Sequence, residues 1–211
     1  MSNPATALHL GVPLSAAKVV CVLLHGRGQS PEMMDDHVVR RVTSGDVAYV
    51  LPRAPGGSWY QARAIDALTA QTRTELAAAL DQIHLLAEEA GTRVPVIIAG
   101  FSQGACVAIE YALHNKRCHG VVAFTGCRVG VPTDQRTQAV LDGLPVYLSC
   151  SESDPWIPLA SWMQAIETFG ISRARVRTDL FPGRGHEVSE VEIGVLSRML
   201  TGLGNGAGVG W

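Results

Sequence analysis

Several features that mark particular protein classes are missing from this sequence. Charged residues make up only 17% and hydrophobic residues 47%, which excludes a disordered chain and a coiled coil. The net charge is −2 and no Lys/Arg stripe is present, so neither nucleic acid nor an anionic membrane is an expected partner. No apolar run reaches the roughly 20 residues that a bilayer-spanning helix needs, and the N-terminus lacks a secretory signal pattern. We therefore expect no stable membrane insertion and a cytoplasmic location.

The chain also lacks the patterns of disulfide, metal and dinucleotide sites. Its five cysteines include no C-x-x-C pair and lie mostly in apolar segments, which indicates buried thiols rather than a disulfide framework. There is no H-E-x-x-H motif and no Cys/His cluster with metal-ligand spacing. No G-x-G-x-x-G opens a helix after the first predicted strand. We therefore expect no metal and no cofactor.

What the chain does contain is an alternation of short apolar runs with longer helical patterns. Such alternation predicts βαβ units, and hence an α/β fold with a mostly parallel central sheet and helices on both faces. The predicted strands are 19–24, 47–51, 94–99, 120–124, 146–150 and 174–180. The predicted helices are 69–90, 102–115, 158–169 and 187–203.

The length of 211 residues suits one domain that spans residues 1–211, and no linker divides the chain. Flexibility is expected only in the N-terminal segment 1–16 and in the glycine-rich tail 202–211. Within that tail, Trp211 is the side chain able to dock on the domain.

The pentapeptide Gly100-Phe101-Ser102-Gln103-Gly104 lies where a predicted strand turns into a predicted helix. A serine at such a turn is held in a strained conformation that exposes its hydroxyl, and the flanking glycines let strand and helix approach closely. The helix N-terminus also favours developing negative charge. The pattern alone is weak in a chain with 22 glycines, since small residues also form plain tight turns. Its strand-to-helix context favours a catalytic nucleophile.

A serine hydroxyl is a poor nucleophile at neutral pH and requires a base. Among the seven histidines, His186 lies in a Pro/Gly loop between the last predicted strand and the last predicted helix. Such a loop can carry the ring over the carboxyl ends of the strands, where Ser102 also emerges. His84 and His114 fall in helical patterns and His119 precedes a strand, so these three are interpreted as structural.

The base in turn needs a carboxylate to orient it and to stabilise the imidazolium. Asp154 follows the predicted strand 146–150 in a loop at the same edge of the sheet, and Glu152 is its nearby competitor. Asp134 and Asp142 are less well placed. With Asp154 as the acid, the chain order is nucleophile, acid and base, as expected for an α/β-hydrolase arrangement.

Two backbone amides are candidates for the oxyanion hole that acyl transfer requires. One is the N–H of Gln103, next to the nucleophile at the predicted start of a helix. The other is the N–H of Arg27, in the glycine-containing loop that follows the first predicted strand. His25 in the same loop is interpreted as a residue that fixes the loop rather than as the base.

Five segments together resemble one known family of α/β-hydrolases. They are LLHGRGQSPEMM, APGGSWY, AGFSQGACVAIEYAL, SESDPWIP and GRGHEVS, and they resemble the phospholipase/carboxylesterase family, in the family's order. Its members include acyl-protein thioesterases and small bacterial carboxylesterases, and the resemblance extends from about Lys18 to about Leu200. It implies a compact domain without a large lid and hydrolysis of carboxylic esters or thioesters. The site residues that it implies are Ser102 as nucleophile, Asp154 as acid, His186 as base, and the Arg27 and Gln103 amides as oxyanion hole.

The chain departs from the family pattern at two places. Family members often have His-Gly just before the triad-acid segment, where this chain reads Ser149-Cys150-Ser151-Glu152. Arg27 replaces the apolar residue that eukaryotic thioesterases have at that loop position. Because only the Arg27 N–H is needed for the oxyanion, an arginine here is compatible with catalysis, but its charged side chain argues against a long apolar acyl tunnel.

Aromatic and methionine side chains are expected in or beside the loops that rim the site. They are Trp156, Trp59, Tyr60, Phe101 and Met33, and each forms either an apolar substrate pocket or part of the core. Trp156 is the strongest candidate because it follows the proposed acid by two residues. A compact cleft with several aromatic residues favours short-chain or aryl esters. The expected partner is a small-molecule ester, and a homodimer remains open.

The sequence therefore predicts a serine esterase, a carboxylic ester hydrolase that works through a catalytic triad and an acyl-enzyme. The nearest alternative is an acyl-protein thioesterase or lysophospholipase that uses the same triad on longer chains. A dienelactone-type hydrolase would have a cysteine nucleophile, whereas residue 102 is serine. A catalytically silent binding module usually lacks a triad member, and here all three candidates are present.

Overall fold

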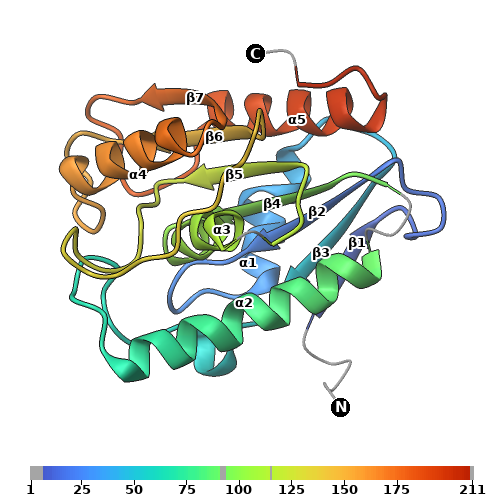
Figure 1. Ribbon diagram of the computed structural model, residues 1–211. Helices are drawn as coiled ribbons and strands as arrows, with labels where there is room; N and C mark the ends of the chain where they lie inside the picture. The colour runs from blue at the N-terminus through green and yellow to red at the C-terminus, as the bar shows by residue number, and fades with distance from the viewer. Residues whose placement is uncertain (1–6, 91–93, 115, 210–211) are drawn as a thin grey trace.

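The computed structural model describes residues 7–90, 94–114 and 116–209 (Figure 1). Within these residues, seven strands form one sheet in the order β1-β3-β2-β4-β5-β6-β7. The strands are β1 (Ala7–Gly11), β2 (Val19–Leu24), β3 (Val47–Pro52), β4 (Val96–Phe101), β5 (Gly120–Phe124), β6 (Pro145–Cys150) and β7 (Arg175–Leu180). The helices are α1 (Pro31–His37), α2 (Ala70–Ala90), α3 (Gln103–Leu113), α4 (Leu159–Ile171) and α5 (Glu190–Gly204), with 3₁₀ turns η2 (Val39–Arg41) and η3 (Pro55–Gly57).

The predicted α/β fold with a mostly parallel sheet is confirmed, because every strand pairing is parallel except that of β1 with β3. All six predicted strands are present as β2 to β7. The largest shift is at β4, which was expected at 94–99 and lies at Val96–Phe101. The four predicted helices correspond to α2, α3, α4 and α5.

Two short elements were missed near the N-terminus. Ala7–Gly11 forms β1, which pairs with β3 from Ala7 opposite Pro52 to Gly11 opposite Ala48. Part of the segment expected to be flexible is therefore an ordered edge strand. The other missed element is α1, which Ser30 caps by accepting a hydrogen bond from the Met33 amide.

The predicted flexible tail also begins inside an ordered element, because α5 extends to Gly204. Beyond the helix, Val209 is buried against the domain. The predicted docking of Trp211 lies outside the described residues.

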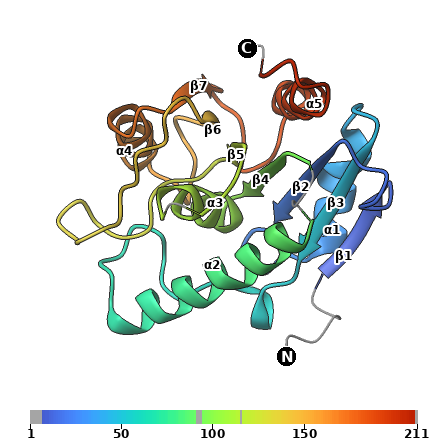
Figure 2. The ribbon, with the colours of Figure 1, turned by 45° about the vertical axis from the view of Figure 1, so that its right-hand side comes forward.

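Helices cover both faces of the sheet, as Figure 2 shows. On one face, α2, α3 and α4 contribute Leu80, Ile109 and Phe169 to a large apolar core. On the other face, α1 and α5 contribute Met34 and Leu196 to a second core. The central strands are apolar along their whole length because both of their faces are buried.

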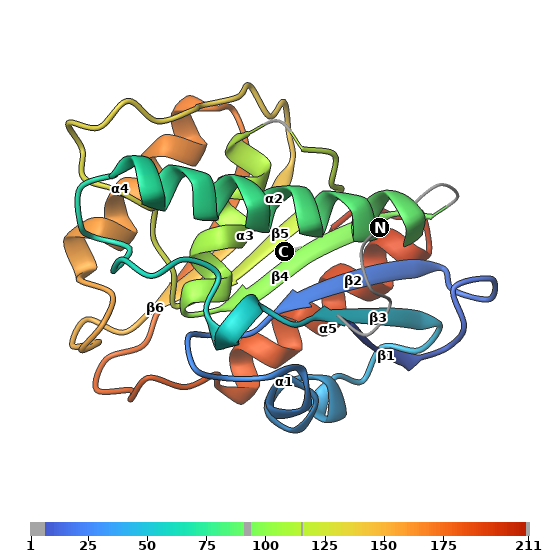
Figure 3. The same ribbon diagram turned by 90° about the horizontal axis from the view of Figure 1, so that it is seen from below.

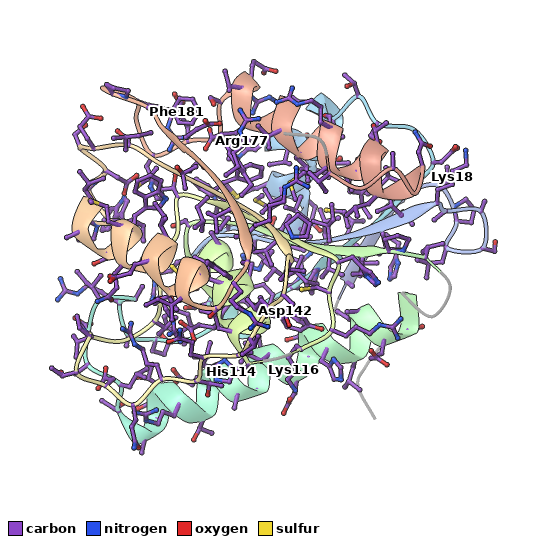
Figure 4. All side chains as sticks on the ribbon, turned by 45° about the horizontal axis from the view of Figure 1, so that its top comes forward. Lys18, His114, Lys116, Asp142, Arg177 and Phe181 are labelled. Atoms are coloured by element: carbon purple, nitrogen blue, oxygen red, sulfur yellow. The ribbon has the colours of Figure 1, made fainter. Side chains whose placement is uncertain are left out.

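The carboxyl ends of the parallel strands meet at one edge of the sheet. Figure 3 shows the arrows of β2 and β4 directed toward this edge. Figure 4 shows Phe181, directly after β7, at the opposite end of the molecule from Lys18, which precedes β2. The segments that follow β4, β6 and β7 hold Ser102, Asp154 and His186, so the fold brings these three residues to the same edge.

Candidate active site

Ser102 lies between β4 and α3 in a strained backbone conformation, with φ 54° and ψ −118°. Its side chain makes no capping hydrogen bond to the helix, and its hydroxyl has no hydrogen-bond partner among the residues that the structure describes. The glycines on either side are required by close backbone contacts. A Cβ on Gly104 would lie 2.3 Å from the Leu24 carbonyl oxygen, and one on Gly100 would lie 2.4 Å from the Gly104 backbone. The pentapeptide therefore forms the sharp turn that the motif predicts.

Asp154 is buried and oriented toward His186. Its Oδ2 lies 2.7 Å from the His186 Nδ1, while its Oδ1 accepts hydrogen bonds from the amides of Trp156 (2.9 Å) and Ile157 (2.8 Å). A carboxylate at this position stabilises the tautomer in which Nδ1 carries the proton. The His186 Nε2 is then free to accept a proton from a nucleophile.

Ser102 and His186 line one cavity of about 340 Å³. The His186 ring packs on Phe101, with 4.8 Å between the ring centroids. Among the described residues, no hydrogen bond joins the Ser102 hydroxyl to the imidazole. Catalytic hydrogen bonds of this kind are often long in unliganded enzymes and tighten when substrate binds.

Glu152, the competing acid, has a different partner. Its carboxylate accepts hydrogen bonds from the Gly183 amide at 2.9 and 3.1 Å, and this contact is the main reason that the pKa of Glu152 is lowered. Glu152 thereby stabilises the loop that carries His186, but it does not contact the His186 imidazole. Asp134 and Asp142 also have partners elsewhere.

The two candidate oxyanion-hole amides belong to segments that adjoin Ser102. Within the described part of the chain, neither the Arg27 amide nor the Gln103 amide donates a hydrogen bond. A Cβ on Gly26 would lie 3.3 Å from the Ser102 Cβ, so the loop that carries Arg27 packs directly against Ser102. Two unpaired N–H groups beside the serine are the arrangement that an oxyanion requires.

His25 holds this loop in place. Its Nδ1 lies 2.7 Å from the Gly26 carbonyl oxygen, and its Nε2 accepts a hydrogen bond of 3.0 Å from the Ala54 amide. Its own carbonyl accepts a hydrogen bond from the Trp59 indole at 2.8 Å. The ring is fully buried, and this burial lowers its pKa. His25 therefore fixes the loop and does not reach the cavity.

The side chain of Gln103 has a role that the sequence did not reveal. It accepts a hydrogen bond from the Trp59 amide at 3.0 Å and donates one to the Tyr60 carbonyl at 2.7 Å. Gln103 thus joins the start of α3 to the loop after η3. That loop forms one wall of the cavity through Tyr60.

Two of the five side chains predicted at the rim line the cavity, namely Tyr60 and Trp156. Trp156 is 67% exposed. The structure places the other three outside the lining: Trp59 lies in the core, Phe101 packs on His186, and Met33 is on the exposed side of α1. The lining residues that the sequence did not suggest are Arg63, Ala64, Cys106 and Ile157.

A comparison with known families decides what kind of protein this is. The family model for phospholipase/carboxylesterase matches residues 12–202. The chain belongs to the phospholipase/carboxylesterase family. As a member of this family, it has the α/β-hydrolase fold and is a carboxylic ester hydrolase.

Solved structures agree with this assignment. A phospholipase/carboxylesterase from Dyadobacter fermentans is 28% identical, with a TM-score of 0.83 over 92% of this chain and 95% of that one. Acyl-protein thioesterase 2 from Zea mays is 15% identical, with a TM-score of 0.75 over 94% and 98%. The Bacillus cereus carboxylesterase is 19% identical, with a TM-score of 0.70 over 92% of each chain. The last two show the fold alone, and no curated protein matches the chain.

In this phospholipase/carboxylesterase family member, a buried polar network anchors the loop that carries His186. The carboxylate of Glu192 is fully buried and accepts hydrogen bonds from the Ser189 amide (2.6 Å), the Ser149 hydroxyl and the Arg184 guanidinium. Arg184 also donates to the Thr125 hydroxyl at 2.7 Å. The network joins the ends of β5 and β6 to α5. Its one visible signal in the sequence is the capping-box spacing of Ser189 and Glu192.

Other expectations concern metals, thiols and membranes. Among residues 7–90, 94–114 and 116–209, no group of three His, Cys, Asp or Glu side chains is arranged to hold a metal ion. The five cysteines are free, and only Cys118 is not fully buried. In the same residues, no helix is long and apolar enough to span a bilayer.

Proposed function

We propose that this chain is a serine esterase in which Ser102 is the nucleophile, His186 the base and Asp154 the orienting acid. The observation that carries the proposal is the 2.7 Å contact between His186 Nδ1 and Asp154 Oδ2. This pair stands beside a cavity that also contains the free hydroxyl of a strained serine. A weak nucleophile, a base with a free nitrogen and a buried carboxylate are the three groups that acyl transfer to serine needs.

The reaction has two acyl-transfer steps. His186 Nε2 takes the proton of Ser102 as its oxygen attacks the ester carbonyl, and the Arg27 and Gln103 amides stabilise the oxyanion. The alcohol leaves with the proton from His186, and the acyl group remains on Ser102. Water, deprotonated by His186, then attacks the acyl-enzyme and releases the acid.

Short-chain or aryl esters are the proposed substrates. A cavity of about 340 Å³ lies near the lower end of the usual size range for small-molecule sites. The Tyr60 and Trp156 rings in its lining suit a flat or compact apolar group. An acyl-protein thioesterase or lysophospholipase would use the same triad on longer chains. A nitrophenyl ester series from acetyl to palmitoyl separates the two, because kcat/KM should fall beyond short acyl chains in a small-ester enzyme.

A fluorophosphonate probe tests the nucleophile directly. The wild-type protein should be labelled and hydrolyse esters, whereas Ser102→Ala should lose the label and at least about a thousandfold of kcat/KM. Ser161→Ala, in α4 and outside the cavity lining, is the matched control and should label like the wild type. A folded wild-type protein that takes no label, or equal labelling of Ser102→Ala, would support a silent binding module instead.

A further inference from the structure

The charged side chains that line the active-site cavity are of one sign. Arg27 and Arg63 both line it, and the described lining residues include no Asp or Glu. Guanidinium groups beside a reaction centre are the usual partners of carboxylates, because their N–H donors form a planar fork that matches the two oxygens. The cavity is therefore electrostatically suited to a substrate that carries negative charge.

The Arg27 guanidinium is held in position by uncharged partners. Its Nη1 donates to the Gln61 carbonyl at 2.9 Å, its Nη2 donates to the Ala62 carbonyl, and it lies over the Tyr60 ring with Cζ 5.9 Å from the centroid. These contacts orient the group without neutralising it. Two of its five N–H donors are used, so three remain for a ligand.

Arg63 differs because a carboxylate already binds it. Its Nε and Nη2 donate to Asp66 Oδ1 at 3.0 and 2.7 Å. Hydrogen bonds with Arg63 lower the pKa of Asp66, and hydrogen bonds from the Gln61 amide and Gln71 lower that of Glu75. The charge of Arg27 adds a smaller contribution to both, but neither carboxylate binds Arg27. Glu75 accepts its hydrogen bonds from the Gln61 amide and from Gln71 instead. Of the two cations in the lining, Arg27 is the one without an ion-pair partner in the described chain.

The position of Arg27 also fixes how far a bound anion lies from the reaction. Its amide is one of the two proposed oxyanion donors, and the preceding residue, Gly26, packs against Ser102. The distance from the scissile carbonyl to an anion held by the Arg27 guanidinium is thus limited to the length of one arginine side chain plus the two hydrogen bonds that hold the two groups. Only a compact substrate places both groups correctly.

We propose that the preferred substrates are small esters that carry a carboxylate close to the scissile bond, and that Arg27 is the residue that selects them. The inference rests on the proposed esterase function and names the substrate class of the same site. The carboxylate belongs either to the acyl part, as in a half-ester of a short dicarboxylic acid, or to the alcohol part, as in an acyloxybenzoate.

Matched pairs of esters test the proposal, each pair differing only by carboxylate against carboxamide. The pair 4-acetoxybenzoate and 4-acetoxybenzamide places the charge on the alcohol side, and monoethyl succinate and ethyl succinamate place it on the acyl side. For at least one pair, the wild-type kcat/KM should be about 10- to 100-fold higher for the carboxylate. The preference should shrink as salt is raised from low to high concentration. The proposal would be overturned if both esters of each pair were hydrolysed at equal rates, or if the esters that carry a carboxamide were hydrolysed faster.

Substitutions of Arg27 test whether its side chain causes the preference for carboxylate esters. In Arg27→Met the carboxylate-to-amide ratio should fall to about 1, and any effect on the oxyanion amide cancels because it acts on both members of a pair. Arg27→Lys should restore part of the ratio, since it keeps the charge but not the fork. Arg63→Gln should keep the wild-type ratio, and Arg173→Gln, on the exposed surface, should keep both ratio and rate.

The outcomes separate this proposal from the proposed function. A wild-type ratio that survives in Arg27→Met, at low and high salt, would refute the role of Arg27. If the wild-type protein hydrolyses the neutral esters normally but does not prefer the carboxylate esters, the esterase function stands and only the proposed substrate class is refuted. If neither carboxylate nor amide esters are hydrolysed and no fluorophosphonate label forms, the proposed function itself fails. Should Arg27→Met not fold, Arg27→Lys and Arg63→Gln decide the question: a ratio that is unchanged in Arg27→Lys or lost in Arg63→Gln would refute the role of Arg27.

Discussion

Arg184 and Glu192 form an ion pair whose side chains are only 7% and 0% exposed. The pair joins the loop before His186 to the first turn of α5. A charge left alone in such a site costs far more than the pair contributes, because it is removed from water without a partner. The position of the proposed base is therefore tied to this pair.

Breaking the pair should destabilise the fold and displace His186. Glu192→Gln or Arg184→Met is expected to lower the free energy of unfolding by about 3–5 kcal/mol, as measured by urea titration at pH 7. Arg173→Gln is the control, because its pair with Asp142 is exposed and should contribute less than about 1 kcal/mol. Equal effects of buried and exposed substitutions would contradict this account.

The two acidic residues near His186 should respond differently to neutralisation. Asp154→Asn should lower kcat/KM by at least about a thousandfold, because an amide no longer stabilises the imidazolium and favours the wrong tautomer. Glu152→Gln keeps an oxygen that can accept from the Gly183 amide and should lose less than about tenfold. Steady-state hydrolysis of an aryl ester measures both. The reverse order of losses would transfer the acid role to Glu152.

Gly104 should be irreplaceable even by alanine. The added Cβ would lie 2.3 Å from the Leu24 carbonyl oxygen, so strand β2 and helix α3 must move apart. We expect Gly104→Ala to cost about 3 kcal/mol or more and to reduce activity. Gly170→Ala in α4 is the matched control, because no atom lies within 4 Å of its Cβ position. It should stabilise the protein by about 0.5–1 kcal/mol. Comparable urea midpoints for the two variants would contradict the packing argument.

Stability should fall as the solution becomes acidic. Burial lowers the pKa of His25 and of His119 in the folded chain, whereas histidines in the unfolded chain titrate near 6.5. Below about pH 6.5 the unfolded state therefore binds protons that the folded state does not. The free energy of unfolding should be highest above that pH and should decrease until the pH reaches the lowered folded-state pKa values.

The measurement is the urea midpoint between pH 7.5 and 5. In His25→Gln, the slope of the free energy of unfolding against pH should be shallower by up to the contribution of one proton. A slope that is the same in His25→Gln and the wild type would rule out His25 as a contributor.

Much of the architecture was predictable because burial on both faces makes a strand apolar throughout. The run 19–24 is such a case, and all six of its residues are buried in β2. β1 escaped notice because it is a five-residue edge strand with partly exposed residues, so its pattern is weak. The serine turn was predictable because close backbone contacts leave no room for a side chain at Gly100 and Gly104. Glycine is therefore required at a fixed spacing on either side of Ser102.

The cavity lining was less predictable, and Trp59 and Tyr60 show why. The two residues are neighbours in the sequence and both are buried in the core. Trp59 donates to the His25 carbonyl, whereas only Tyr60 also lines the cavity. Their backbone is held by hydrogen bonds with Gln103, which is more than 40 residues away along the chain and accepts from the Trp59 amide and donates to the Tyr60 carbonyl. Contacts between distant segments leave no local periodicity. The hydrogen bonds of Arg184 to Thr125 and of Ser149 to Glu192 escaped prediction for the same reason.

The end of the described chain lies far from the chemistry. Val209 lines a surface hollow with Cys118, His119 and Pro145, which stand at the amino ends of β5 and β6. Ser102, Asp154 and His186 stand at the carboxyl ends of the parallel strands. Attachment of the protein to a solid support through a residue beside this hollow would therefore turn the edge that holds the proposed triad outward, toward the bulk solution that delivers the ester.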